Sequence, residues 1–261
     1  FSGTGSFIPK NKIDNNSFSD KVFFDKDGNG YPNSNVEIIE KFQKITGIKE
    51  RRYADKEHKT SDLATFAAKN AIKDAGIDKE TLDYIIVAHN FGEIEYGTNQ
   101  YIALPSVATM VKHKLEISNE NCVAYDLIFG CPGWLEGVIQ ASAFIKSKMA
   151  KRCLVIGADT LSRTIDKSDR DSMIFADGAG ATIVEENSES GGILSHKTIT
   201  KAGKEALYLF CETSYDPTNK KSNKHIKMNG RKVYEFAISN IPSALKSVSY
   251  THLTLPTTTL V

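Results

Sequence analysis

The sequence predicts a layered α/β fold, because short strand patterns alternate with longer helical patterns along most of the chain. The apolar run at 82–88 (LDYIIVA) is typical of a buried strand, and helical patterns precede it at 60–76 and follow it at 104–117. The first of these helical segments ends at Gly76, a residue type that commonly terminates helices. We therefore expect a sheet with helices packed on its faces.

The alternation continues through the middle of the chain. Further elements are predicted as strands at 121–130, 151–159 and 179–186 and as helices at 132–148 and 232–248. The strand at 121–130, the helix after it and the strand at 151–159 form a β-α-β unit. Cys131 lies between the first strand and the helix of this unit.

The composition is that of an ordinary globular protein. The 261 residues are 40% apolar, and 33 basic side chains balance 32 acidic ones to a formal net charge of +1. Such a chain can bury a core as one large domain or two small ones. No basic stripe indicates binding to nucleic acid, and the apolar runs are far shorter than the roughly 20 residues that span a bilayer. We expect neither a nucleic-acid partner nor a membrane partner.

Cysteine usage indicates free thiols. The four cysteines are widely spaced and form no C-x-x-C pair, which argues against a zinc site and against a disulfide framework; they are Cys122, Cys131, Cys153 and Cys211. The N-terminal stretch FSGTGSFIPK has no basic start and no apolar signal core, so we interpret it as the first strand of a domain without an export signal. The expected location is the reducing cytoplasm.

One loop resembles part of a calcium site. Residues 25–30 (DKDGNG) place Asp25, Asp27 and Asn29 at alternating positions, as in the first half of an EF-hand loop. The twelfth position, which requires a bidentate glutamate, is Val36, and a helical pattern begins too early. A polar surface turn is the better interpretation, and no metal site is expected.

The stretch 129–134 (FGCPGW) sets Cys131 where a strand ends and a helix begins. Pro132 suits the first helical position because its missing N–H would have no partner there, which makes Cys131 the expected N-cap. The positive end of a helix dipole favours a thiolate at that position, and free N–H groups can stabilise the oxyanion that forms when sulfur attacks a thioester. From local sequence alone, an inert buried cysteine remains the alternative.

The helix that follows Cys131 is predicted to be mostly buried. Gly133, Gly137 and Ala141 recur every four residues, so one side of the helix is nearly bare and allows a close approach. Apolar residues occupy most of its remaining surface. A buried helix with a cysteine at its start is compatible with a closed acyl pocket.

Several stretches together resemble one enzyme family. They are YDLIFGCPGW at 125–134 and the run that continues to 184, GTGSFIP at 3–9, TGIKERRYA at 46–54 and KMNGRKVYEFAI at 227–238. With these stretches the sequence resembles β-ketoacyl-acyl carrier protein synthase III over nearly the whole chain as far as about residue 248. The resemblance implies a thiolase-like layered αβαβα fold with a complete N-terminal half and an incomplete C-terminal half.

The resemblance also implies domain boundaries. Residues 1–186 would form the N-terminal half that carries the nucleophilic cysteine, and 187–248 would start the C-terminal half. The Thr-rich stretch 249–261 has no counterpart in the family and is interpreted as a non-native tail. The family's catalytic histidine and asparagine are expected beyond Val261, and His89, at a strand end, is the one candidate substitute.

For function, the resemblance implies an acyltransferase that starts fatty acid synthesis. In the family, the cysteine at the position of Cys131 takes an acyl group from acyl-CoA. Malonyl-acyl carrier protein then loses CO₂, and its carbanion attacks the acyl-enzyme. Acyl-CoA is a substrate, so no cofactor is expected. The family is dimeric through its N-terminal half, which implies a homodimer.

The resemblance assigns substrate contacts as well. Arg170 lies where the family packs an arginine against the adenine of CoA, and Leu104 lies where a side chain closes the acyl pocket of the partner subunit. Phe129 and Trp134 replace small residues beside the cysteine. These two bulky side chains would either reshape the acyl pocket or pack behind the helix.

Departures from the family pattern keep other functions open. The family's CoA-binding tryptophan and arginine correspond to Lys41 and Ile45 in this sequence. One alternative is a CoA-thioester condensing enzyme of another pathway, similar to hydroxymethylglutaryl-CoA synthase or to a secondary-metabolite ketosynthase. The other is a non-catalytic fragment that only dimerises.

Overall fold

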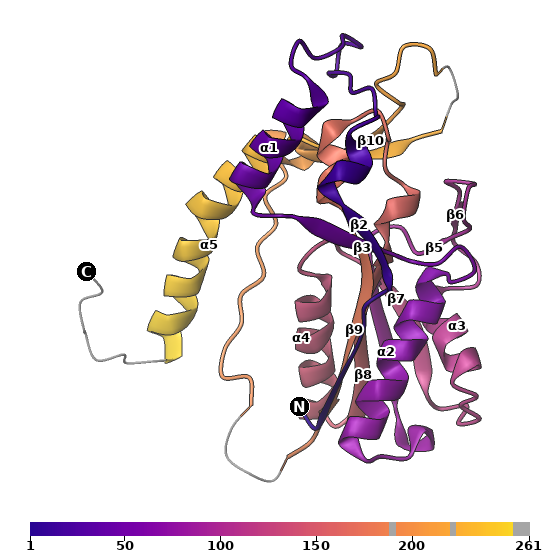
Figure 1. Ribbon diagram of the computed structural model, residues 1–261. Coiled ribbons are helices and arrows are strands. Elements are labelled where there is room, and N and C mark those ends of the chain that lie inside the picture. Colours follow the sequence, from indigo (N-terminus) through magenta and orange to yellow (C-terminus); the bar gives the residue numbers. More distant parts are fainter. Residues whose placement is uncertain (188–191, 220–222, 253–261) are drawn as a thin grey trace. The chain divides into compact units, whose positions relative to one another are not determined.

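The computed structural model describes residues 1–187, 192–219 and 223–252 (Figure 1). These residues form two compact units, of which the first comprises Phe1–Glu186 and Cys211–Ile226 and the second comprises the remainder. All five candidate site residues predicted from the sequence lie in the first unit.

A five-stranded sheet in the order β1-β9-β8-β4-β7 forms the centre of the first unit. Its strands are β1 (Gly3–Phe7), β4 (Tyr84–His89), β7 (Val123–Ile128), β8 (Arg152–Thr160) and β9 (Asp177–Glu185). β4 is parallel to both β7 and β8, whereas β9 is antiparallel to β8 and β1. Because both faces of β4 are covered, its apolar run is unbroken, and Ile85, Ile86 and Val87 are fully buried.

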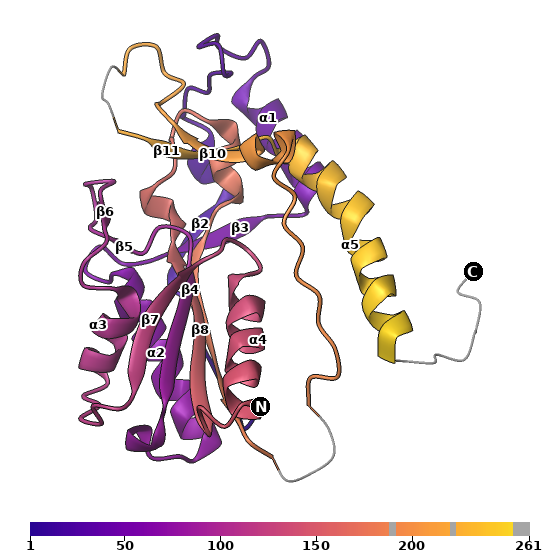
Figure 2. The same ribbon diagram turned by 180° about the vertical axis from the view of Figure 1, so that it is seen from behind.

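Helices cover both faces of this sheet. α2 (Thr60–Ala75) packs on β1, β9 and β8, and α3 (Val107–Lys114) packs beside it on β7 and β4. α4 (Gly133–Lys146) covers the opposite face (Figure 1 and Figure 2). β7, α4 and β8 form the predicted β-α-β unit, and β4 lies between its two strands. The predicted layered α/β arrangement is therefore confirmed.

The contact between β1 and α2 is very close, because glycines on the strand face fully buried alanines on the helix. A Cβ atom at Gly5 would lie 2.2 Å from the carbonyl oxygen of Ala67, and a Cβ atom at Gly3 would lie 2.4 Å from that of Ala71. The helix backbone therefore rests directly on the strand, and a side chain at either glycine would force the two apart.

Replacing Gly5 by alanine is expected to destabilise the protein by about 3 kcal/mol, because the new methyl group overlaps backbone atoms of α2 that move only with the whole helix. The matched control is Gly180→Ala on the neighbouring strand β9, where a Cβ atom meets no atom within 4 Å. This control is expected to change the free energy of unfolding by less than about 0.5 kcal/mol. Urea unfolding measures both, and equal values for the two variants would contradict the close packing.

The remaining elements of the first unit lie outside the sheet and its covering helices. They are α1 (Asn35–Thr46), β2 (Asn11–Asp14), β3 (Glu50–Tyr53), β5 (Glu93–Ile94) and β6 (Tyr101–Ile102). β2 pairs with β3, and β5 pairs with β6, both in antiparallel register. Ser34 caps α1 through a capping box with Glu37, in which each side chain accepts the backbone N–H of the other residue.

The loop at 25–30 is a polar turn, as predicted. The carboxylate of Asp25 accepts the backbone N–H groups of Asp27 and Asn29, both at 2.9 Å. Across the described ranges, no group of three or more histidine, cysteine, aspartate or glutamate side chains is placed to hold a metal ion.

The last elements in the sequence are β10 (Leu209–Glu212), β11 (His225–Met228) and α5 (Gly230–His252). β10 pairs with β11, and α5 includes the helix predicted at 232–248. Of the predicted tail, 249–252 continue α5, and 253–261 lie outside the described residues. Within the described part of the chain, no helix has the length and apolar character needed to cross a membrane.

Candidate active site

The parallel strands β7, β4 and β8 end at one edge of the sheet, and the chain leaves β7 there through a tight turn into α4. Gly130 has a φ of +85°, a conformation that glycine adopts at little cost. The N–H of Gly133 donates to the Gly130 carbonyl at 2.9 Å, which closes the turn around Cys131 and Pro132. Cys131 is exposed in this turn.

The prediction that Cys131 is the N-cap of α4 is wrong by one residue. The N-cap is Pro132, whose carbonyl accepts the Glu136 N–H at 3.1 Å, and the helix begins at Gly133. The reason is the closed turn between Gly130 and Gly133, which uses the two residues before the helix. The thiol therefore belongs to the residue just before the N-cap, still next to the positive end of the helix dipole.

The prediction that α4 is mostly buried holds only for the face on the sheet. Gly137 is buried there, and a Cβ atom on it would lie 2.8 Å from Val155 Cγ1. Leu135 is exposed, and Trp134 is exposed as well although its Cβ atom lies against the sheet. The periodicity of the helix could not show which of its apolar side chains other described segments cover and which they leave exposed.

Phe129 and Trp134 flank the Cys131 turn, and each is 37% exposed. The Trp134 ring lies 6.3 Å from that of Phe1, centre to centre, and its Cβ atom packs against Gly157 of β8. The structure thus brings Cys131, Phe129 and Trp134 together on one connection. Leu104 lies instead on the connection between β6 and α3, and Arg170 lies at the start of a short helical turn, Arg170–Ile174.

Two carboxylates anchor the residues at the end of β4. The side chain of His89 is fully buried, and its Nε2 lies 2.9 Å from Asp126 Oδ2. Asp126 also accepts the N–H groups of Val107 and Ala108, at 2.8 and 2.7 Å, at the start of α3. Burial raises the pKa of Asp126, but the hydrogen bonds from His89, Val107 and Ala108 together lower it by more. The pKa of Asp126 therefore lies below its ordinary value. The His89 ring is therefore enclosed, with its Nε2 next to the Asp126 carboxylate.

The second carboxylate is Asp159, at the end of β8. It accepts the backbone N–H and the side-chain amide of Asn90 at 2.9 and 2.7 Å. Burial raises the pKa of Asp159, although these hydrogen bonds oppose the shift. Asn90 Oδ1 lies 3.7 Å from the place where a Cβ atom of Gly130 would be, so this polar pair stands beside the Cys131 turn.

Sequence reasoning missed both carboxylates. Asp126 and Asp159 each interrupt an apolar strand pattern, as in YDLI and IGAD. A charged residue within a buried strand is rarely tolerated unless it is paired. That rule would have marked both residues, but it would not have identified their partners.

Arg170 lies at the start of a short helical turn, and its guanidinium is 4.6 Å from the centre of the Tyr31 ring. Its Nε is also 3.5 Å from a carboxylate oxygen of Asp171. Burial raises the pKa of Tyr31. Ile45, where the family has an arginine, is an exposed apolar side chain. Tyr31 is thus the aromatic neighbour of Arg170 in this chain.

Leu104 is 84% exposed. The helix predicted to begin at 104 starts at Val107, because the Ser106 side chain caps it by accepting the Thr109 N–H. Leu104 therefore lies in the connection between β6 and α3, and it projects from the surface of the first unit.

Comparisons with known proteins agree with this arrangement. The family model of 3-oxoacyl-[acyl-carrier-protein] synthase III matches residues 125–202, which include the Cys131 turn. The chain is 36% identical to β-ketoacyl-[acyl-carrier-protein] synthase III of Oceanobacillus iheyensis over 94% of its own length and 69% of the relative's. It is 38% identical to the enzyme of that name from Neisseria meningitidis serogroup B, over 91% and 67% of the two lengths.

Comparison with solved structures indicates the same family. The crystal structure of 3-oxoacyl-[acyl-carrier-protein] synthase III from Aquifex aeolicus superposes with a TM-score of 0.74 and 29% identity, covering 94% of this chain and 69% of that one. The chain therefore spans about two thirds of the length of its relatives. It belongs to the β-ketoacyl-acyl carrier protein synthase III family of condensing enzymes and has their thiolase-like α/β fold.

Proposed function

We propose that Cys131 accepts an acyl group from acyl-CoA, and that the protein condenses this group with malonyl-acyl carrier protein in the first condensation of fatty acid synthesis. The observation that carries the proposal is the exposed Cys131 in a closed turn at the start of α4, in a chain of this family. Acyl-CoA acts as a substrate, and the reaction needs no further cofactor.

The proposed acylation uses the position of the cysteine. The Cys131 thiolate attacks the thioester carbonyl, a tetrahedral oxyanion forms, and its collapse breaks the carbon–sulfur bond to CoA, which leaves as the thiol after protonation. The N–H groups in the first turn of α4 and the positive end of its dipole favour both the thiolate and the oxyanion. The malonyl carbanion left by decarboxylation then attacks the acyl-Cys131 carbonyl, and the cysteine thiolate is released.

Four further residues are proposed as substrate contacts. Phe129 and Trp134 flank Cys131 and would limit the room for an acyl chain. Arg170 would contact the CoA nucleotide with Tyr31 at its side, and Leu104 would reach the acyl pocket of a partner subunit. We also propose that 187–248 begin a second thiolase-like half and that the enzyme works in the cytoplasm, where its free thiols would stay reduced.

The test is to incubate the purified chain with labelled acetyl-CoA and to map the label by peptide mass spectrometry. We expect the label on the peptide that contains Cys131. Adding malonyl-acyl carrier protein or a second acetyl-CoA as the acceptor then separates a synthase III from an enzyme similar to hydroxymethylglutaryl-CoA synthase. Absence of label with acetyl-CoA and with longer acyl-CoA donors would refute the acyltransferase.

The proposed homodimer is supported by the contrast between the two edges of the sheet. The residues of β1 that are exposed are polar, Thr4 and Ser6. On β7, by contrast, Val123 and Ile128 are exposed, and Ile128 is 65% accessible. An apolar edge strand with open backbone groups favours pairing with another chain, and a two-fold axis would bring the same edge of each copy together.

Replacing Ile128 by aspartate is expected to convert the dimer into a monomer, because a carboxylate would be buried without a partner on both sides of the two-fold axis. Sedimentation velocity measures the change in mass. Ile8→Asp, the same substitution at another exposed isoleucine, is the control and should leave the dimer intact. A dimer that persists in Ile128→Asp would exclude β7 as the interface.

A further inference from the structure

The connection Ala103–Ser106 joins β6 to α3 and is exposed in its middle. Ala103, Leu104 and Pro105 are all exposed, whereas Val107 and Ala108 immediately after it are buried. A short exposed connection keeps a defined position only if both of its ends are fixed. The structure fixes each end with a carboxylate that accepts backbone N–H groups at the start of a neighbouring helix.

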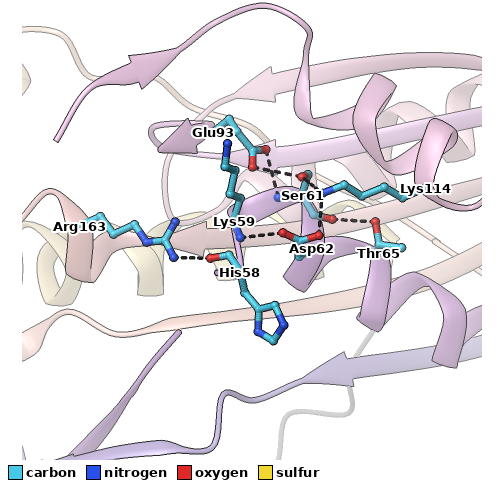
Figure 3. Close-up of polar contacts among 8 residues, drawn as sticks. All are labelled: His58, Lys59, Ser61, Asp62, Thr65, Glu93, Lys114 and Arg163. Carbon is cyan, nitrogen blue, oxygen red and sulfur yellow. Dashed lines mark hydrogen bonds and ion pairs between the residues drawn. The ribbon is translucent and has the colours of Figure 1, made fainter. Parts of the chain in front are cut away.

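The first carboxylate is Glu93 of β5, which is only 6% exposed. It accepts the backbone N–H of Ser61 at 3.2 Å and the Ser61 hydroxyl at 3.1 Å, at the start of α2 (Figure 3). Glu93 lies opposite Ile102 in the β5–β6 pair, and Ile102 is two residues before Leu104. The carboxylate thus ties the β5–β6 hairpin, whose second strand leads to Leu104, to the start of α2.

Neighbouring groups hold this tie in place. Lys114, the last residue of α3, donates to the Ser61 hydroxyl at 2.6 Å and to Asp62 at 2.7 Å (Figure 3). The second Asp62 oxygen accepts the Lys59 N–H at 2.8 Å. Burial raises the pKa of Glu93, although the Ser61 hydrogen bonds and the charge of Lys114 oppose the shift. The start of α2 and the end of α3 are therefore linked at the point that Glu93 contacts.

Arg163 fixes the same hairpin from another direction. Its Nη1 donates to the Ile94 carbonyl at 2.6 Å, and its Nη2 donates to the carbonyl groups of Asp55 and His58 in the segment before α2. Figure 3 shows the bond to His58. After the connection, Asp126 holds the first two N–H groups of α3, as described above. Between Ile102 and Val107, the exposed residues are Ala103, Leu104 and Pro105.

We propose that Glu93 is a positioning residue that fixes the Leu104 connection and thereby sets the acyl-chain preference of the pocket that Leu104 closes in the partner subunit. The inference rests on the proposed acyltransferase and its homodimer. A carboxylate suits this role because its two oxygens accept both Ser61 donors at once, which an apolar side chain of the same size cannot do.

The decisive variant is Glu93→Gln. Its side-chain amide keeps one acceptor for the Ser61 N–H, but the Ser61 hydroxyl, which already accepts from Lys114, can then only accept from the amide and no longer donates into the tie, so the tie is weakened while the volume stays the same. Glu95→Gln is the matched control, since Glu95 lies on the same hairpin but is exposed. Leu104→Ala serves as the reference for a pocket that is not closed, and Ser61→Ala breaks the tie from the other side.

The measurement is the rate of acylation of Cys131 by acetyl-CoA relative to hexanoyl-CoA, followed by intact-protein mass spectrometry. We expect Leu104→Ala, Glu93→Gln and Ser61→Ala to shift this ratio in the same direction, Glu93→Gln by roughly fivefold or more, and Glu95→Gln to stay within about twofold of the unmodified chain. A lower melting temperature with an unchanged ratio would overturn the proposal, because a merely structural residue behaves in that way.

The experiment distinguishes failure of the proposed acyltransferase from failure of the Glu93 inference. If the unmodified chain is not acylated by either donor, the acyltransferase is refuted, and the chain-length part of the inference falls with it. Hydrogen exchange of 93–106 still decides the positioning part. Exchange that is faster in Glu93→Gln than in Glu95→Gln supports the anchor, and equal exchange overturns it.

Discussion

Replacing Cys131 by serine is expected to reduce acyl transfer from labelled acetyl-CoA to background. Serine keeps the size of the side chain, but its hydroxyl has a far higher pKa than a thiol, so the helix dipole cannot supply an appreciable amount of the anion. Loss of a nucleophile in enzymes that form acyl intermediates lowers kcat by roughly 10⁴-fold or more. Stopped incubations followed by peptide mapping measure the loss.

The control is Cys211→Ser, because Cys211 is the other exposed cysteine. It should leave labelling unchanged. The two remaining cysteines are poor nucleophiles, since burial raises the pKa of Cys122 to about 11 and that of Cys153 to about 12. Label that persists in Cys131→Ser, or that disappears in Cys211→Ser, would show that the nucleophile is a residue other than Cys131.

Replacing Asp126 by asparagine is expected to lower the free energy of unfolding by about 3 kcal/mol at pH 7, because it removes the partner of the buried His89 and weakens the cap of α3. Urea unfolding measures the change. Asp20→Asn, at an exposed position, is the control and should stay within about 0.5 kcal/mol of the unmodified chain.

The effect of Asp126→Asn should depend on pH. The pKa of Asp126 in the folded protein lies below the ordinary value of 3.8, so near that value the unfolded chain binds more protons than the folded one. The stability that the charge contributes is therefore complete above pH 3.8 and is lost as the pH falls through the lower, folded pKa. The difference between the two proteins should shrink below pH 3.8, and a difference that is constant down to pH 3 would assign the effect to shape rather than charge.

Most of the sheet and its helices could be predicted from the sequence. The helix predicted at 60–76 is α2, which ends at Ala75 with Gly76 in the left-handed conformation, and the strand predicted at 151–159 is β8. These elements could be predicted because the spacing of apolar residues over short stretches of the sequence differs between helices and strands. The β-α-β unit around Cys131 follows in the same way.

The candidate site was less accessible to such reasoning. The turn from Gly130 to Gly133 moved the start of α4 by one residue, and the exposure of Trp134 depends on which segments cover the helix. Leu104 was assigned to a helix, although its connection to β6 leaves it exposed. The first and third differences arise from local hydrogen bonds, the Gly130–Gly133 turn and the Ser106 cap, whereas the second depends on contacts made elsewhere in the chain.

The fold class, the family and the position of Cys131 between a strand and a helix could all be predicted from residues that are neighbours along the chain. Three features, by contrast, required the folded chain: β4 lies between β7 and β8, Asp126 pairs with His89, and Glu93 accepts hydrogen bonds from Ser61. The physical reason is that a hydrogen bond or ion pair between distant segments depends on which strands are adjacent, and no local spacing records that adjacency.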